Sequence, residues 1–312
     1  VGFDDPELEF VAVNDIAKPQ TLAHLLKYDT VYGKPSFDIK VEEDNLIVNG
    51  KRIKILSERD PADLPWEEMD VDIVVESTGL FRKREDASKH LKAGAKKVLI
   101  SAPAKQPDIS FLIGINEQDY DKERHHIVSI GSCTTNGLAP IVKVLDENFG
   151  IEYGIMTTIH SYTSTQNLID GPHKDLRRGR AAAMSQIPTT TGAAKMITVI
   201  FPHLQGRLDG MAIRVPTVCG SLVDLTVTLK QKTSKKNLNL AMKNAAEGDL
   251  KGILEYSTDP IVSADILGNS HSSIFDSLLT YELDQTMFKV FAWYDNEWGF
   301  SARMVDTLKI LL

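Results

Sequence analysis

The sequence predicts an α/β protein of two domains: a doubly wound, mainly parallel sheet is followed by an α+β domain whose sheet is mainly antiparallel. In the first part of the chain short apolar runs alternate with helix-like segments, as in a parallel sheet covered by helices. Longer β-rich runs, separated from the helices, fill the second part. A length of 312 residues also suits about two domains.

The first part opens with a predicted strand and helix. The stretch EFVAVND at 9–15 has the character of a buried strand that ends in an acid, and leucines at helical spacing follow in residues 20–30. An alternating segment at 38–58 contains an Asn-Gly pair at 49–50, which predicts an inserted antiparallel hairpin. Further strands are expected at 71–77, 97–101 and 111–115, with a helix at 83–93.

The second part opens with a long polar loop. Residues 161–192 are rich in Thr, Arg and Gly and have no clear period, and a loop of this length inside a compact fold is usually functional. Strands are expected within 210–231, 273–282 and 287–295, with helices at 135–148, 237–250 and 301–312. We expect domains at 1–132 and 133–296, and a helix within 297–312 that packs back on the first domain.

The composition restricts the function. Hydrophobic residues make up 42% and charged residues 25% of the chain, and no apolar stretch is long enough to cross a bilayer. The net charge of −8 argues against a dedicated nucleic-acid site, so the expected partner is a small molecule. Two cysteines are too few for a disulfide framework and fit a reducing, cytoplasmic environment. We expect no metal site.

Cys133 is the most specific candidate for chemistry. It lies in SCTTN, at the start of a predicted helix, where the positive helix terminus lowers a thiol pKa and favours the reactive thiolate. His160, at the end of the apolar run YGIMTTIH, is a candidate base for it. A buried structural cysteine is the commoner situation, so both interpretations of Cys133 stay open on these grounds. Cys219, in a strand-like run, is interpreted as core.

Several residues could bind anions. A Thr-Gly pair before a helix, as in TTTG at 189–192, offers backbone amides to phosphate, and Arg214 offers a planar fork of donors. Thr163 and the cluster HKDLRRGR at 173–180 could join them, which is enough for two anion sites. The alternative for most of that cluster is a solvated or subunit-facing basic loop.

Asp15 points to a dinucleotide. An acid at the end of the first strand commonly binds the ribose 2′-hydroxyl and repels a 2′-phosphate, which favours NAD over NADP; a turn or N-cap aspartate is the alternative. Small residues after two further strands, in ESTG at 76–79 and SAPAK at 101–105, agree with a cofactor, although simple turns are the commoner role of such residues. The residues before Asp15 contain no G-x-G-x-x-G, although the phosphate loop is expected about 20 residues upstream of such an acid.

Taken together, six stretches resemble the phosphorylating glyceraldehyde-3-phosphate dehydrogenases. They are SCTTN, TTIHSYT, GPHKDLRRGRAAA, IPTTTGAAK, LDGMAIRVPT and WYDNEWGFSARMVD. The resemblance covers essentially the whole chain. It implies a Rossmann-type NAD-binding domain, a catalytic domain and a cytoplasmic homotetramer that works in glycolysis.

The resemblance also implies residue roles. Cys133 matches the nucleophile and His160 the base. The substrate and phosphate sites match Ser132, Thr134, Thr163, Arg178, Thr191, Gly192 and Arg214. The NAD contacts match Asp15, Arg59, Ser101 and Asn296, of which Asn296 orients the nicotinamide amide.

The chain departs from the family pattern in three places. The Gly-rich strand, turn and helix of the family are expected before Val1, outside these residues. Gly137 stands where many members have a second cysteine, and Phe300 where a tyrosine is frequent. Gly171-Pro172 follows the NAD-preferring pattern.

The expected reaction is the oxidative phosphorylation of glyceraldehyde 3-phosphate to 1,3-bisphosphoglycerate with NAD and inorganic phosphate. It proceeds through a hemithioacetal and a thioester on the cysteine. One alternative is erythrose-4-phosphate dehydrogenase. Another is an inactive fragment or binding scaffold, because the glycine loop is missing.

Overall fold

A computed structural model describes all 312 residues, which form two compact units. Unit 1 comprises Val1–Ile109, Asp121–Ser129 and Val305–Leu312, and unit 2 comprises Ser110–Tyr120 and Ile130–Met304. The division into an NAD-binding and a catalytic domain at residues 132 and 296 stays a prediction. No helix is both long and apolar enough to cross a membrane.

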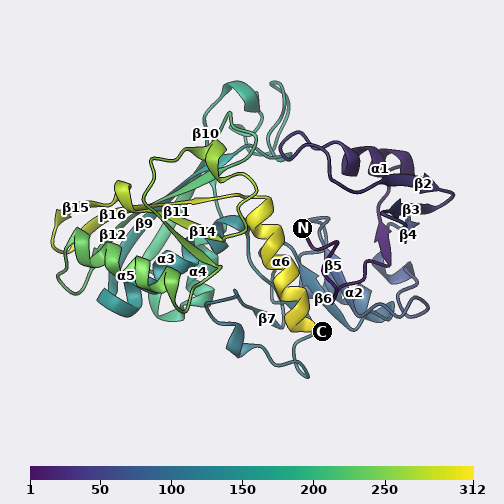
Figure 1. The fold of residues 1–312 in the computed structure, drawn as a ribbon, viewed down its shortest axis with the longest axis horizontal. Coiled ribbons are helices and arrows are strands. Elements are labelled where there is room, and N and C mark those ends of the chain that lie inside the picture. Colours follow the sequence, from purple (N-terminus) through teal and green to yellow (C-terminus); the bar gives the residue numbers. More distant parts are fainter. The chain divides into compact units, whose positions relative to one another are not determined.

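The first sheet of unit 1 has the strand order β1-β4-β3-β2 (Figure 1). Its strands are β1 (Ala12–Asn14), β2 (Ile39–Glu42), β3 (Asn45–Val48) and β4 (Lys51–Leu56). β1 and β4 are parallel, whereas β3 and β4 form the predicted hairpin. Asn49 and Gly50 turn it with φ of 48° and 83°, the left-handed pair that a tight hairpin needs. Helix α1 (Pro19–Lys27) contacts β2 and β3.

The second sheet of unit 1 has the order β5-β6-β8-β7. It comprises β5 (Ile73–Glu76), β6 (Lys97–Ile100), β7 (Ile109–Ser110) and β8 (Ile127–Ser129). β5, β6 and β8 are parallel, and α2 (Arg84–Lys92) contacts β6 and β8. The parallel α/β arrangement is confirmed, with its strands divided between two sheets.

The strand expected at 111–115 is wrong. Phe111 and Leu112 are buried, but the backbone turns at 113–116. Asn116 stabilises this turn, because its side chain accepts from the amide of Leu112 at 3.0 Å and donates to the Ser110 carbonyl at 3.3 Å. An apolar run reports burial, and burial alone does not distinguish a strand from a packed turn.

Unit 2 contains an eight-stranded mixed sheet of order β10-β11-β9-β12-β16-β14-β13, with β15 paired to β16. The strands are β9 (Ile151–Ser161), β10 (Ile187–Thr190), β11 (Leu208–Val215), β12 (Ser221–Leu229), β13 (Leu254–Ser257), β14 (Ser273–Asp276), β15 (Tyr281–Asp284) and β16 (Met287–Tyr294). The β9–β11 and β13–β14 pairs are parallel and the others antiparallel, as the sequence predicts.

Strands β9 and β11 approach closely at Gly210. A Cβ atom there would overlap the carbonyl oxygen of Met156. The same pairing places Arg214 opposite His160.

Helix α3 (Cys133–Phe149) contacts β9, β12, β14 and β16. Helices α4 (Ala193–Ile200) and α5 (Lys235–Glu247) both contact α3, and Figure 1 shows the three helices beside the sheet. The last helix, α6 (Trp298–Leu311), ends the chain. Short 3-10 helices occur at Pro61–Asp63, Glu117–Asp119, Ala182–Met184, Pro202–Leu204, Ser263–Ile266 and Ser277–Leu279.

Candidate active site

Cys133 is the first residue of α3. Ser132 is the N-cap, and its Oγ accepts from the amide of Thr135 at 3.2 Å, while Thr135 Oγ1 accepts from the amide of Ser132 at 3.3 Å. This reciprocal capping box fixes where the helix begins. The predicted position of Cys133 at a helix start is therefore confirmed.

His160 faces the thiol from the end of β9. Its Nε2 lies 3.5 Å from Cys133 Sγ, and its Nδ1 lies 2.7 Å from the Ser161 carbonyl. In the tautomer that donates to this carbonyl, Nδ1 carries the proton and Nε2 presents a lone pair to the thiol. The predicted pairing of these two residues is present in the structure.

Arg214 on β11 completes the cluster. Its Nη1 donates to the Ser161 carbonyl at 2.9 Å and lies 2.7 Å from Nδ1 of His160. Burial and the adjacent guanidinium lower the pKa of His160 to about 3. The imidazole is therefore neutral at neutral pH, and the nitrogen without the proton has a lone pair. The buried Nε of Arg214 has no partner within the chain.

The thiol differs from the sequence-based expectation. Burial raises the pKa of Cys133, whereas the charge of Arg214 and the hydrogen bonds from Thr134 act in the lowering direction. The helix start alone predicts a lowered pKa. Here the desolvation of the buried thiol raises its pKa by more than the helix start, Arg214 and Thr134 lower it. The thiol is therefore protonated and needs the neutral imidazole to take its proton.

Sequence reasoning missed Tyr294, at the end of β16. Its hydroxyl bonds Thr134 Oγ1 at 2.8 Å and Thr158 Oγ1 at 2.7 Å, and its ring meets the imidazole of His160 edge-on at 5.9 Å between centroids. Thr134 and Tyr294 are 160 residues apart in sequence, so no local spacing could reveal the contact. The only signal was the position of Tyr294 inside the WYDNEW stretch.

The predicted phosphate ligands lie in the same unit. Thr134 and Ser132 use their hydroxyls within the chain, in the Tyr294 and Thr135 contacts respectively. Thr191 Oγ1 accepts from the amide of Ala193 at 3.2 Å, and Gly192 is the N-cap of α4. These four residues can therefore offer a phosphate mainly their backbone amides, at the starts of α3 and α4.

Arg178 belongs to the polar loop. Its Nε donates to Thr189 Oγ1 at 2.8 Å and lies 3.5 Å from a carboxylate oxygen of Asp175. The charges of Arg178 and Cys133 both act on Arg214. The Thr163 hydroxyl bonds Thr165 at 2.9 Å. The guanidinium of Arg214, whose charge acts on the thiol of Cys133, suits an anionic substrate.

Asn296 follows β16 by two residues. Its Oδ1 accepts from the amide of Gly220 at 3.1 Å and from Ser221 Oγ at 2.8 Å. Its Nδ2 has no partner within the chain, and can donate to a bound group.

The other predicted NAD contacts are in unit 1. Asp15 follows β1, and one of its carboxylate oxygens accepts from the amide of Ala17 at 2.8 Å, which leaves the other available. Ser101 follows β6, and its amide donates to the Glu76 carbonyl at 3.1 Å. Arg59 is exposed. Asp15 and Ser101 thus lie at the carboxyl ends of parallel strands, where α/β sheets bind ligands.

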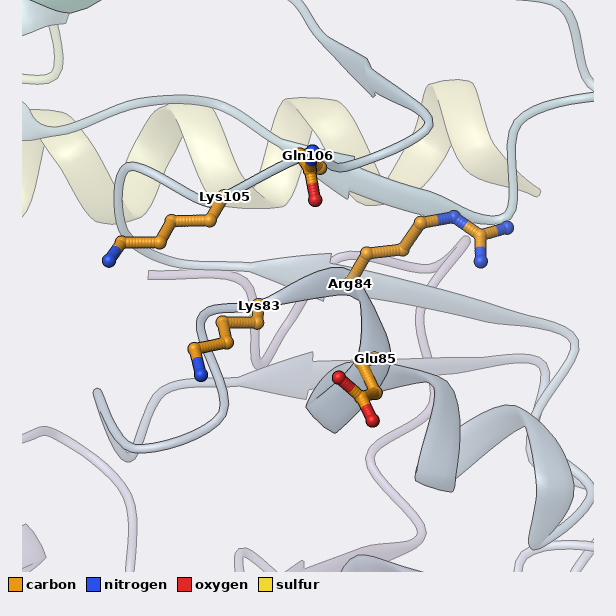
Figure 2. A pocket seen from close by; sticks show the side chains of 5 residues that line it. All are labelled: Lys83, Arg84, Glu85, Lys105 and Gln106. Carbon is orange, nitrogen blue, oxygen red and sulfur yellow. The ribbon is translucent and has the colours of Figure 1, made fainter.

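A separate pocket in unit 1 contains none of the predicted residues. Figure 2 shows its lining of Lys83, Arg84, Glu85, Lys105 and Gln106 at the start of α2. All five are exposed, and Arg84 is paired with Asp108 at 2.7 Å. In the whole structure, no group of three His, Cys, Asp or Glu could hold a metal ion.

Comparisons with known proteins agree with this geometry. Residues 1–84 match the family model described as "Glyceraldehyde 3-phosphate dehydrogenase, NAD binding domain", and residues 132–296 match the C-terminal domain model of the same family. Glyceraldehyde-3-phosphate dehydrogenase of Geobacillus stearothermophilus is 57% identical over 302 residues, which are 97% of this chain and 90% of that protein.

Two further relatives carry the same name. The protein of Streptomyces coelicolor is 56% identical over 301 residues, 96% of this chain and 90% of its own. Glyceraldehyde-3-phosphate dehydrogenase 2 of Trichormus variabilis is 51% identical over 312 residues, all of this chain and 93% of its own.

Proposed function

We propose that this chain, which belongs to the glyceraldehyde 3-phosphate dehydrogenase family, oxidises D-glyceraldehyde 3-phosphate to 1,3-bisphosphoglycerate with NAD and inorganic phosphate. The observation that carries the proposal is the neutral imidazole of His160, whose Nε2 is 3.5 Å from the thiol of Cys133 and whose pKa is lowered to about 3. The alternative of erythrose-4-phosphate dehydrogenase is not favoured by the three relatives described above, which carry the glyceraldehyde name.

The first half of the reaction takes place on the thiol. His160 accepts the proton of Cys133 as the sulfur attacks the aldehyde carbon and passes it to the carbonyl oxygen, which becomes the hydroxyl of a hemithioacetal. His160 then takes that hydroxyl proton while the carbon loses a hydride and becomes a thioester. Bound NAD supplies the chemistry of a hydride acceptor.

The second half regenerates the thiol. Inorganic phosphate attacks the thioester carbon, the C–S bond breaks, and the acyl phosphate leaves. The protonated His160 can return a proton to the departing sulfur. Two oxyanions, the substrate phosphate and the attacking phosphate, therefore need places near one sulfur.

The chain offers residues for both anions. Thr163 and Arg214 are proposed to bind the substrate phosphate, and the buried unpaired Nε of Arg214 supports an anion there. Ser132, Thr134, Thr191 and Gly192 are proposed to receive the attacking phosphate through groups at two helix starts. Arg178 is proposed to assist, since its charge acts on Arg214.

The residues proposed for NAD fit that group. Asn296 has a free amide donor for the nicotinamide carboxamide, and Asp15 has a free carboxylate oxygen for a ribose hydroxyl. Ser101 and Arg59 complete the set. A Gly-rich phosphate loop before Val1 stays an expectation, as do a homotetramer and a cytoplasmic location.

The test measures NADH absorbance with glyceraldehyde 3-phosphate, NAD and phosphate present. Cys133→Ala should abolish it, and Cys219→Ser, which keeps a donor toward Asp295, should retain it. Full activity in Cys133→Ala would refute the mechanism. Faster turnover of erythrose 4-phosphate would reverse the choice of substrate, and calorimetry that detects no NAD binding would favour the scaffold.

A further inference from the structure

The orientation of the Asn296 side chain is fixed by its neighbours. The amide of Gly220 can only donate, so the atom of Asn296 that lies 3.1 Å from it must be the oxygen. Ser221 Oγ, at 2.8 Å, and the more distant Sγ of Cys219, at 3.9 Å, face the same oxygen. The Nδ2 donors therefore point away from this group of residues.

The direction of the Ser221 hydroxyl is also determined. Ser221 is the first residue of β12 and is buried. Its Oγ accepts from the amide of Ser161 at 3.1 Å, a donor that cannot accept. The hydroxyl hydrogen is then available to Asn296 Oδ1. Ser221 therefore accepts a hydrogen bond from Ser161, at the end of β9, and donates one to Asn296.

Ser161 connects the same chain to the base. Its Oγ donates to the Gly220 carbonyl at 3.1 Å, and its own carbonyl accepts from Nδ1 of His160 at 2.7 Å. Every polar group of Ser161 is thus used, one toward the catalytic base and two toward the segment that holds Asn296. All of these residues are buried or half-buried in unit 2.

We infer that Ser221 is a positioning residue, which holds the Asn296 amide with its donors toward the nicotinamide. Ser221 is itself held by Ser161, whose carbonyl also contacts His160. The inference rests on the proposed function, because it assumes that Asn296 contacts NAD. Without the Ser221 hydroxyl, Asn296 Oδ1 loses one of its two short bonds and the amide of Ser161 loses its acceptor. The Asn296 amide can then rotate and present its oxygen.

The primary test is Ser221→Ala with two readouts. The dissociation constant for NAD, measured by calorimetry, should rise about fivefold, since a lost hydrogen bond of this kind is worth about 1 kcal/mol. The acylation of Cys133 by p-nitrophenyl acetate needs no NAD and should be unchanged, because the Ser161 carbonyl that contacts His160 and Arg214 is not altered. The matched control is Ser273→Ala, which removes a buried serine hydroxyl that has no partner.

A double-mutant cycle shows whether Ser221 acts on NAD binding through the Asn296 amide or through a general loss of local structure. In an Asn296→Ala background, Ser221→Ala should leave the NAD dissociation constant unchanged, because no amide remains to be oriented. Ser221→Cys has a similar shape but a weaker donor, so its NAD dissociation constant should lie between those of wild type and Ser221→Ala. This variant also tests the inference if Ser221→Ala fails to fold.

Three results would overturn the inference. They are unchanged NAD binding in Ser221→Ala, an equal effect of Ser273→Ala, and an effect of Ser221→Ala that persists without Asn296. A wild-type protein that acylates Cys133 and binds NAD but makes no NADH would instead refute the proposed function. The two failures are therefore distinguishable.

Discussion

Two histidines, His90 in unit 1 and His160 in unit 2, are equally buried, each 4% exposed, yet only one is arranged for chemistry. His90 lies on α2 between two side chains. Trp66 Nε1 donates to its Nδ1 at 3.1 Å, and its Nε2 faces a carboxylate oxygen of Glu76 at 3.0 Å. An indole N–H only donates, so Nε2 carries the proton and donates to Glu76.

The difference between them is a free lone pair. Both nitrogens of His90 are used by neighbouring side chains, so the ring can neither take nor give a proton without breaking a buried bond. The structural contacts of His160, with the Ser161 carbonyl and Arg214 Nη1, are both at Nδ1, and its second nitrogen faces the Cys133 thiol. Burial of a histidine therefore says little about its role, whereas the count of its satisfied nitrogens says much.

The largest expected effect is at His160. His160→Asn removes the base, so kcat/KM should fall about 10²- to 10⁴-fold, the usual contribution of general base catalysis. The steady-state NADH assay measures this, with urea unfolding as the check on folding. A variant that is stable and within a few-fold of wild type would remove the distinction between the two histidines.

The second effect is a loss of stability at His90. His90→Ala leaves the buried Glu76 carboxylate without its donor and Trp66 without its acceptor, so the free energy of unfolding should fall by about 3 kcal/mol. Urea unfolding at neutral pH measures it. The kcat of the folded variant should stay unchanged, and a specific loss of kcat with intact stability would contradict a structural role.

The third effect is a change in pH dependence at Glu76. Burial acts to raise its pKa, but hydrogen bonds from His90 and Thr78 outweigh it and hold the pKa below the ordinary 4.5. Below that pH the unfolded chain gains a proton that the folded chain does not, so stability is complete above pH 4.5 and falls as the pH drops further.

Glu76→Gln should therefore flatten this acid loss, in unfolding curves compared at neutral pH and near pH 4. Glu85→Gln, at an exposed glutamate of α2, is the matched control and should keep the wild-type slope. If the free energy of unfolding falls equally with pH in wild type and Glu76→Gln, the hydrogen bonds from His90 and Thr78 do not stabilise the charged Glu76 carboxylate.

The smallest effect is expected at Gly137, next to the Tyr294 ring. A Cβ at Gly137 would lie 3.1 Å from two ring atoms of Tyr294, so Gly137→Ala should lower the free energy of unfolding by about 1 kcal/mol, partly offset by better helix propensity. Thermal unfolding measures it. A loss of several kcal/mol would show that the Tyr294 ring cannot shift.

The comparison also shows what a sequence can predict. Cys133 and His160 were identifiable because a helix start and a strand end are local patterns, and the family resemblance named both. The network of Trp66, His90 and Glu76 was not, since it depends on rotamers of residues that no motif joins. The apolar residues at 111–115 predict a strand, but the side chain of Asn116 holds the backbone in a turn at 113–116.

The close approach of β9 and β11 at Gly210 has a consequence for mutational tolerance. Any side chain at this position would push the strands apart or shift their pairing by a residue, and a one-residue shift exchanges the two faces of a strand. Arg214 would then no longer stand opposite His160. A residue with no functional group, remote from the substrate along β11, is therefore expected to tolerate as little sequence variation as the catalytic pair.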